Sequence, residues 1–166
     1  RMLSELTADD DRNRLIASDV EKEVRSGKGV CLVLSDRKKH CETLQGILRY
    51  KFDVQSELLT GDLNNEARKT VLAHLNQGQV RVLIATGQLI GEGFDCPDLS
   101  TLFMATPIRF SGRVIQYLGR ILRPAQGKSR ARVYDYVAER VAPLVAAAKA
   151  RQLVYGGGSG EIFENR

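Results

Sequence analysis

Apolar residues follow two patterns along this chain: short continuous runs, and positions spaced three or four apart. A continuous apolar run bounded by turn residues is typical of a strand buried on both faces, as in parallel sheets. Helical spacing between the runs predicts helices, so strands and helices alternate. This order predicts an α/β fold, a three-layer αβα sandwich with a mainly parallel sheet and helices on both faces. The strands are expected at residues 30–34, 54–59, 80–85, 99–105 and, as an alternating stretch near a sheet edge, 131–137.

Capping residues mark where the helices between these strands begin and end. Acidic and amide side chains accept hydrogen bonds from the first turn of a helix, and glycine often follows the last turn. A further Ala-rich helix is expected over about 138–151. The expected starts are the acidic run 9–11, Ser35-Asp36 and Asn64 or Asn65, and the expected ends are Ser26-Gly27, about Tyr50 and Gly78.

Small and hydroxyl-bearing residues follow directly after four of the predicted strands. They are Ser35, Thr60-Gly61, Thr86-Gly87 and Pro107. In open parallel sheets, ligands gather outside the carboxyl ends of the strands. We therefore expect these residues to line one edge of the sheet together.

The stretch 112–124 reads G-R-V-I-Q-Y-L-G-R-I-L-R-P and has the spacing of an amphipathic helix that the final proline ends. Gln116, Arg120 and Arg123 share one face, opposite an apolar stripe. Guanidinium groups suit forked contact with phosphate oxygens, so this face is a candidate phosphate site. The alternative is the solvated basic face of an ordinary amphipathic helix.

The loop 91–97, G-E-G-F-D-C-P, is a second candidate ligand site. Its glycines permit close approach of a ligand, and Asp95 could accept hydrogen bonds from ribose hydroxyls. The alternative is a plain turn capped by Asp95. A complete phosphate-binding P-loop is missing, because the glycine required five residues before Gly127-Lys128 is replaced by Leu122.

Composition narrows the class of protein. A net charge of +5 and a pI near 9.3 suit a polyanionic partner. No apolar run approaches a membrane span, and three cysteines at wide spacing predict no zinc or other metal site. We expect an intracellular, cytoplasmic protein with reduced thiols and Cys31 in the core. His40 and His74 are expected at surface or boundary positions.

The glycines at 156–160 predict that residues 156–166 form a flexible tail after a single domain at 1–155. The chain opens at Arg1, which suggests a piece of a longer protein.

Four segments together resemble the conserved motifs of superfamily 2 helicases. Q-Y-L-G-R-I-L-R-P resembles motif VI, and V-L-I-A-T-G-Q-L-I-G-E-G-F-D-C-P resembles motif V. V-C-L-V-L-S-D resembles motif IV, and L-L-T-G-D-L-N-N-E-A-R resembles the segment after it. Their order and spacing fit across about residues 29–137. The resemblance implies the second, C-terminal RecA-like domain of a helicase, and the glutamine that opens motif VI looks more like XPB-type and restriction-enzyme-type DNA motors than DEAD-box RNA helicases.

The resemblance also implies roles for individual residues. Arg123 would be the arginine finger, with Arg120 and Gln116 holding the phosphates or the attacking water. Two motif V residues would meet the nucleotide, Asp95 near the ribose. The residues in these roles would be Gln116, Arg120 and Arg123 as catalytic and nucleotide-binding groups, Gly93 and Asp95 as nucleotide-binding groups, and Ser35, Gly61 and Thr86 as contacts to the nucleic-acid backbone.

The implied cofactor is ATP with Mg²⁺, whose ligands would lie on an N-terminal RecA-like domain of the same parent chain. The implied partners are that domain and a nucleic acid, DNA more than RNA, with no membrane. The isolated chain would lack ATPase activity because the P-loop domain is absent. Two competing classes stay open, a non-catalytic nucleic-acid-binding or interaction module and a small doubly wound signalling or flavin domain.

Overall fold

The computed structural model describes residues 8–27, 29–61, 63–86, 96, 98–106 and 131–136, and the backbone of residues 161–165. Three helices and six strands lie in these ranges. In chain order they are α2 Asp10–Ser26, β1 Val30–Leu34, α3 Lys38–Phe52, β2 Glu57–Leu59, α4 Asn65–Asn76, β3 Val82–Ala85, β4 Leu99–Met104, β5 Ala131–Asp135 and β6 Glu161–Asn165.

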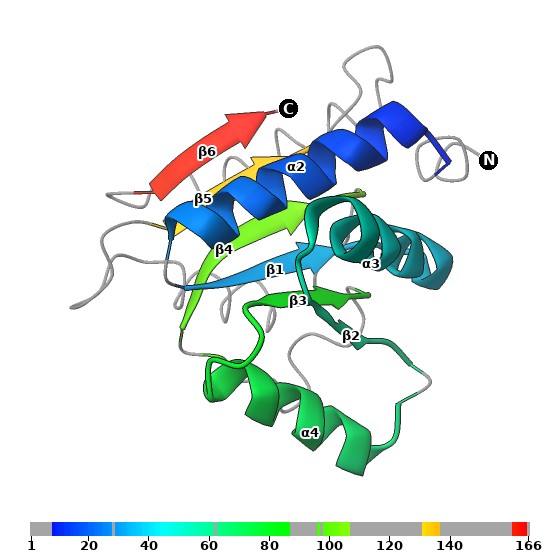
Figure 1. Ribbon diagram of the computed structural model, residues 1–166, viewed down its shortest axis with the longest axis vertical. Helices are drawn as coiled ribbons and strands as arrows, with labels where there is room; N and C mark the ends of the chain where they lie inside the picture. The colour runs from blue at the N-terminus through cyan, green and yellow to red at the C-terminus, as the bar shows by residue number, and fades with distance from the viewer. Residues whose placement is uncertain are drawn as a thin grey trace.

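The strands form one sheet in the order β2-β3-β1-β4-β5-β6, and every neighbouring pair is parallel. All the arrows in Figure 1 accordingly point the same way. This confirms the α/β fold with a parallel sheet that the alternation of strands and helices predicts. β1, the first strand in the sequence, is central because β3 and β4 flank it.

The structure differs from the expected tail at residues 161–165. These residues form β6, which pairs with β5 along its whole length and makes β6 the edge strand. Ile162 and Phe163 have the high strand propensity that such pairing favours. The glycines at 156–160 dominate the local composition, so the sequence pattern understates this strand.

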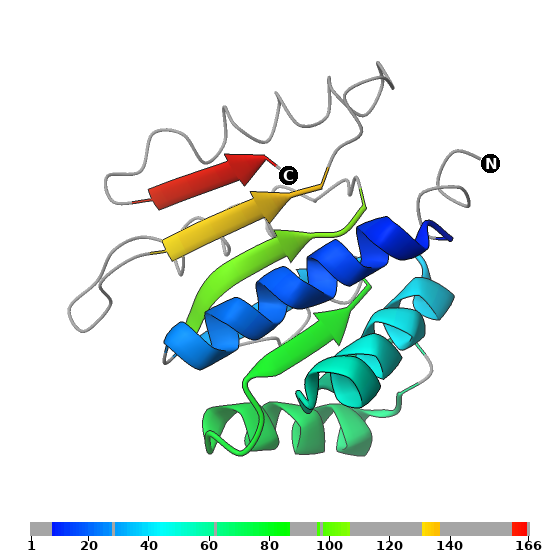
Figure 2. The same cartoon turned by 45° about the horizontal axis from the view of Figure 1, so that its top comes forward.

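Side chains of β1 point alternately to two helical layers. Leu32 and Leu34 belong to an apolar cluster with Leu75 of α4, whereas Cys31 and Val33 pack in a second cluster that includes residues of α2 and α3. The helices α2 and α3 therefore cover one face of the sheet, and α4 covers the other, as Figure 2 shows. Burial of Cys31 confirms its predicted place in the core.

Two of the predicted helix starts are confirmed and one is wrong. The Asp9 carboxylate accepts the Arg12 amide at 3.1 Å at the start of α2, and Asn64 accepts the Ala67 amide at 2.8 Å at the start of α4. Ser35-Asp36 does not cap α3, which begins at Lys38. Other contacts hold these two residues outside the helix, because Ser35 donates its amide to the Ala85 carbonyl and Asp36 donates its amide to the Thr106 hydroxyl.

β1 and β4 approach very closely at their amino ends. A Cβ atom added at Gly29 would lie 2.2 Å from the Ser100 hydroxyl and 2.9 Å from the Asp98 carbonyl oxygen. The Val30 amide donates to that same carbonyl at 2.9 Å. Glycine is therefore required where the chain enters the central strand. No helix among the described residues is long and apolar enough to cross a membrane.

Candidate functional site

Because all the strands are parallel, their carboxyl ends meet at one edge of the sheet, which we call the carboxyl edge. Backbone bonds join the residues just past neighbouring strands: the Ser35 amide donates to Ala85 at 3.1 Å, and the Thr86 amide donates to Leu59 at 3.3 Å. Gly61 follows Leu59 by two residues. The structure therefore brings Ser35, Gly61 and Thr86 to the carboxyl edge, as the strand order predicts.

Ser35 is fully buried at this edge, and its hydroxyl points inward. Its Oγ lies 2.8 Å from Nδ1 of His40, and it accepts the Arg37 amide at 3.2 Å. On the other side of the ring, Nε2 of His40 lies 2.7 Å from Oδ1 of Asn13 in α2. A buried hydrogen-bonded chain therefore runs from α2 through α3 to the turn after β1.

His40 is buried, which corrects the surface or boundary position expected from its helical spacing. Burial, and to a smaller extent the neighbouring charge of Arg12, lowers the pKa of His40 to about 4. The ring is therefore neutral near pH 7. Nε2 carries the proton and donates it to Asn13, so Nδ1 accepts the Ser35 hydroxyl proton. His74 lies half-buried, 3.0 Å from a Glu57 carboxylate oxygen, in line with its predicted boundary position.

The other two residues expected to contact nucleic acid are more accessible than Ser35. Gly61 is exposed, and a Cβ atom added there would meet no atom of the described part of the chain within 4 Å. Thr86 is half-buried. Both are open to a ligand that approaches the carboxyl edge, whereas the Ser35 side chain acts inside the protein.

Three consecutive basic residues, Arg37, Lys38 and Lys39, lie exposed where α3 begins at the carboxyl edge. The first turn of α3 contains no acidic residue, and the amino end of a helix favours anions. This basic run is not among the residues that the sequence patterns predict to bind a ligand. Its position directly after a buried strand is the signal that could have found it.

Arg12, in the first turn of α2, binds the carboxyl ends of two strands at once. Its Nη1 donates to the Ala105 carbonyl at 2.8 Å, just past β4, and its Nη2 donates to the Tyr136 carbonyl, just past β5. The guanidinium also lies 6.0 Å from the centroid of the Tyr136 ring. Burial lowers the pKa of Arg12 from its usual value, and the carboxylates of Asp9 and Asp135 oppose that effect. Arginine remains cationic in proteins, so the group that binds these two carbonyls carries a positive charge.

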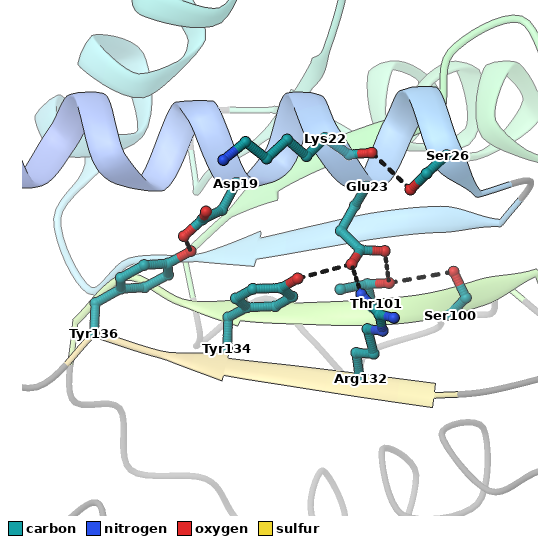
Figure 3. Close-up of polar contacts among 9 residues, drawn as sticks. All are labelled: Asp19, Lys22, Glu23, Ser26, Ser100, Thr101, Arg132, Tyr134 and Tyr136. Carbon is teal, nitrogen blue, oxygen red and sulfur yellow. Dashed lines mark hydrogen bonds and ion pairs between the residues drawn. The ribbon is translucent and has the colours of Figure 1, made fainter. Parts of the chain in front are cut away.

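Two carboxylates further along α2 also point at the sheet (Figure 3). Glu23 accepts hydrogen bonds from Arg132 at 2.6 Å and from the Tyr134 hydroxyl at 2.8 Å. Asp19 accepts the Tyr136 hydroxyl at 2.8 Å. One face of α2 is therefore attached to β5 along its length.

The remaining predicted site residues lie outside the described residues. These are Gly93, Asp95, Gln116, Arg120 and Arg123. The described residue that precedes the arginine-bearing segment is Thr106, which is buried and accepts the Asp36 amide at 2.8 Å. Within the described ranges, no cluster of three or more His, Cys, Asp or Glu residues could hold a metal ion.

Comparison with known families gives one match over most of the chain. Residues 14–125 match the model of the helicase conserved C-terminal domain. The Saccharomyces cerevisiae protein IRC3, whose name assigns it provisionally to the ATP-dependent helicases, is 24% identical over 127 residues. That match covers 76% of this chain and 18% of IRC3. The chain thus spans less than a fifth of the length of the two curated relatives that it matches here.

Two solved structures with similar folds belong to longer chains. The crystal structure of UvsW from T4 has a TM-score of 0.72 and 16% identity, over 99% of this chain and 36% of that one. The structure of Dbp5 from S. cerevisiae bound to RNA and ADP BeF3 has a TM-score of 0.67 and 18% identity, over 92% of this chain and 38% of that one. At these identities the likeness shows the fold.

Proposed function

The chain belongs to the helicase conserved C-terminal domain family, and we propose that it is the second motor domain of an ATP-dependent superfamily 2 helicase or translocase. The observation that carries the proposal is the family match over residues 14–125, because it includes the Q-Y-L-G-R-I-L-R-P stretch. The parallel sheet supports it, since the carboxyl edge of such a sheet is where ligands bind.

The proposed contribution to hydrolysis comes from the face that Gln116, Arg120 and Arg123 share. Arg123 is the arginine finger, and Arg120 and Gln116 hold phosphate oxygens or the attacking water. Bound ATP with Mg²⁺ supplies the phosphoryl group and part of the charge neutralisation. Gly93 and Asp95 contact the nucleotide, with Asp95 near the ribose. A positioned guanidinium stabilises the charge that spreads over the phosphoryl oxygens during transfer.

The other half of the nucleotide site lies, in this proposal, on an N-terminal RecA-like domain of the same parent chain. That domain supplies the P-loop and the Mg²⁺ ligands, so the isolated chain hydrolyses no ATP. We propose a cytoplasmic protein, and the three buried cysteines support a reducing compartment because they form no disulfide with one another.

Nucleic acid binds, in this proposal, along the carboxyl edge through its phosphate backbone. Gly61 and Thr86 approach the backbone directly, and the exposed run of Arg37, Lys38 and Lys39 adds positive charge beside them. Ser35 supports these contacts from inside by fixing the turn that leads to Arg37. We propose that DNA is preferred over RNA, because Gln116 stands where RNA helicases of the DEAD-box group have histidine.

The test is the ATPase of the full-length protein with DNA, with RNA and with neither. Removing the finger by Arg123→Ala should lower turnover by about 10³–10⁵-fold, and Arg123→Lys should restore little because an ammonium lacks the planar fork. Arg109→Ala is the matched control, since Arg109 lies outside the Q-Y-L-G-R-I-L-R-P stretch and has no assigned role itself. If folded Arg123→Ala protein hydrolyses ATP within about tenfold of the wild type, the finger assignment is wrong.

A non-catalytic nucleic-acid-binding module is the alternative with support in the structure, because Gly61 and the basic run lie exposed at one edge. It predicts salt-sensitive binding of oligonucleotides without ATP hydrolysis by the full-length protein. Gly61→Ala separates ligand approach from folding, because the added Cβ meets no atom of the described residues within 4 Å. Weaker binding with an unchanged melting temperature supports direct contact at Gly61.

A further inference from the structure

The first turn of α2 is connected to the carboxyl ends of three strands. Arg12 binds the carbonyls of Ala105 and Tyr136, past β4 and β5. Its neighbour Asn13 binds His40, which in turn binds Ser35 past β1. Two consecutive residues therefore link the amino end of α2 to three of the six strands at the carboxyl edge.

Arg12 donates to the carbonyl groups of the residues that directly follow β4 and β5. The Tyr136 amide donates to the Met104 carbonyl at 3.3 Å, and the Ala105 and Tyr136 carbonyls come directly after this bond along the two strands. Buried carbonyls need donors, and one guanidinium supplies two in a fixed fork. Tyr136 is also held through its ring hydroxyl by Asp19, so α2 fixes that residue at both ends.

The residues that Arg12 holds lead directly into the segment with the proposed catalytic groups. The chain continues from Ala105 and Thr106 into residues 107–130, which contain Gln116, Arg120 and Arg123. Thr106 is also hydrogen-bonded to the turn after β1, because its hydroxyl accepts the Asp36 amide. The base of this segment and the turn before the basic run therefore share one set of contacts.

We propose that Arg12 is a positioning residue for ATP hydrolysis, which holds the base of the arginine-bearing segment in register with the carboxyl edge. This inference rests on the proposed function. Arg12 itself contacts no nucleotide in this role; it fixes where the chain leaves β4, and thereby where the finger stands. Small displacements of a catalytic group cost large factors in rate, up to about 10²-fold for 1 Å.

The role predicts a specific kinetic pattern in the full-length protein. Replacement by Met keeps the length of the side chain but removes both bonds, and replacement by Lys keeps the charge without the fork. We expect kcat to fall about 10–100-fold in Arg12→Met and by less in Arg12→Lys. KM for ATP and the affinity for an oligonucleotide should stay within about twofold, because the groups that bind them remain.

The experiment measures kcat, KM and melting temperature for wild type, both Arg12 variants and Arg14→Met. Arg14 is the matched control, since it is exposed on the same helix two residues away. A fall in kcat at unchanged KM, in protein that melts well above the assay temperature, supports the proposal. Wild-type kcat in folded variants overturns it, and so does an equal fall in Arg14→Met.

Two further outcomes separate the possible failures. If both Arg12 variants are unfolded at the assay temperature, the role of Arg12 is purely structural and the positioning role is rejected. If the wild type itself hydrolyses no ATP with any nucleic acid, or Arg123→Ala is as active as wild type, the proposed function fails and this inference fails with it. Normal turnover in wild type, loss in Arg123→Ala and normal turnover in folded Arg12→Met would reject the positioning role alone.

Discussion

The two faces of the sheet are packed by different chemistry. Against α4, the cluster consists of aliphatic and sulfur-containing side chains such as Leu75 and Leu102. Against α2 and α3, aromatic rings join the core, and the hydroxyls of Tyr134 and Tyr136 reach carboxylates of α2. Apolar contact is non-directional, whereas a hydrogen-bonded carboxylate must meet its donors in one arrangement.

The difference separates two tasks within one sheet. The α4 face contributes stability through buried apolar area. The α2 face contributes stability too, but its polar contacts also fix the position of α2 along the strands. That face ends at the carboxyl edge with Arg12, so in our proposal the polar face is the one that aligns the candidate site with the sheet.

The largest change in the free energy of unfolding should come from creating a cavity in the core between the sheet and α4. Leu102 is fully buried in the middle of β4. Leu102→Ala should lower the free energy of unfolding by about 2–5 kcal/mol through lost contacts and the space left behind. Denaturant titration measures this, and Leu15→Ala on the exposed side of α2 is the control, with a change of about 0.5 kcal/mol or less. Equal losses in the two variants would contradict the packing.

The polar face should respond to acid through His40. Its pKa in the folded state, about 4, lies below the ordinary value of 6.5, so the unfolded chain binds more protons between those values. Stability from this group is therefore complete above about pH 6.5 and declines as the pH falls toward 4, by roughly 3 kcal/mol in total. Comparing unfolding curves of wild type and His40→Gln across this range isolates the effect. Parallel curves would show that His40 does not titrate on unfolding.

Loss of the Glu23 carboxylate should have a smaller effect than the cavity. Glu23→Gln keeps the shape but turns an amide donor toward the donors of Arg132 and Tyr134, so the free energy of unfolding should fall by about 1–3 kcal/mol. Glu21→Gln is the matched control, because Glu21 pairs with the exposed Arg25. That surface pair is worth at most about 1 kcal/mol. Thermal melts of both variants would show whether the two glutamates differ as expected.

The smallest predicted effect is a stabilisation on α3. Gly46 lies inside this helix, and a Cβ atom added there meets none of the residues that the structure describes within 4 Å. Gly46→Ala should raise the free energy of unfolding by about 0.5–1 kcal/mol, since alanine loses less backbone entropy on folding. Chemical denaturation measures the gain. A loss of stability instead would mean that the outer side of α3 is more crowded than the geometry shows.

Much of the sheet could be predicted because buried parallel strands leave a clear signal. The run at 30–34 is apolar throughout, and the strand there matches it residue for residue. β6 was missed because glycines precede it, and pairing to β5 is a tertiary effect that no local pattern encodes. The start of α3 was misplaced because Ser35 and Asp36 bond to β3 and Thr106 instead of to their own helix.

The edge location of the site was predictable, but the side chains that organise it were not. Strand order alone brings Ser35, Gly61 and Thr86 together. The Ser35 side chain points inward because it binds His40, which in turn binds Asn13. His40 and Asn13 are separated by 27 residues and meet only in the folded chain. Arg12 reads as an ordinary surface residue of an amphipathic helix until Ala105 and Tyr136 are placed beneath it.

The strand order has a consequence for co-translational folding, the folding of the chain while the ribosome synthesises it. β4, β5 and β6 lie side by side on one flank of β1 in the order in which they are synthesised. Each emerging strand can therefore dock on an edge that its predecessor has just completed, without displacing anything already in place. The first three strands to be synthesised can pair with one another before β4 leaves the exit tunnel. These are β1, β2 and β3, with α4 between β2 and β3. Until β5 arrives, β4 is an unpaired edge, and the growing chain is then most open to wrong partners.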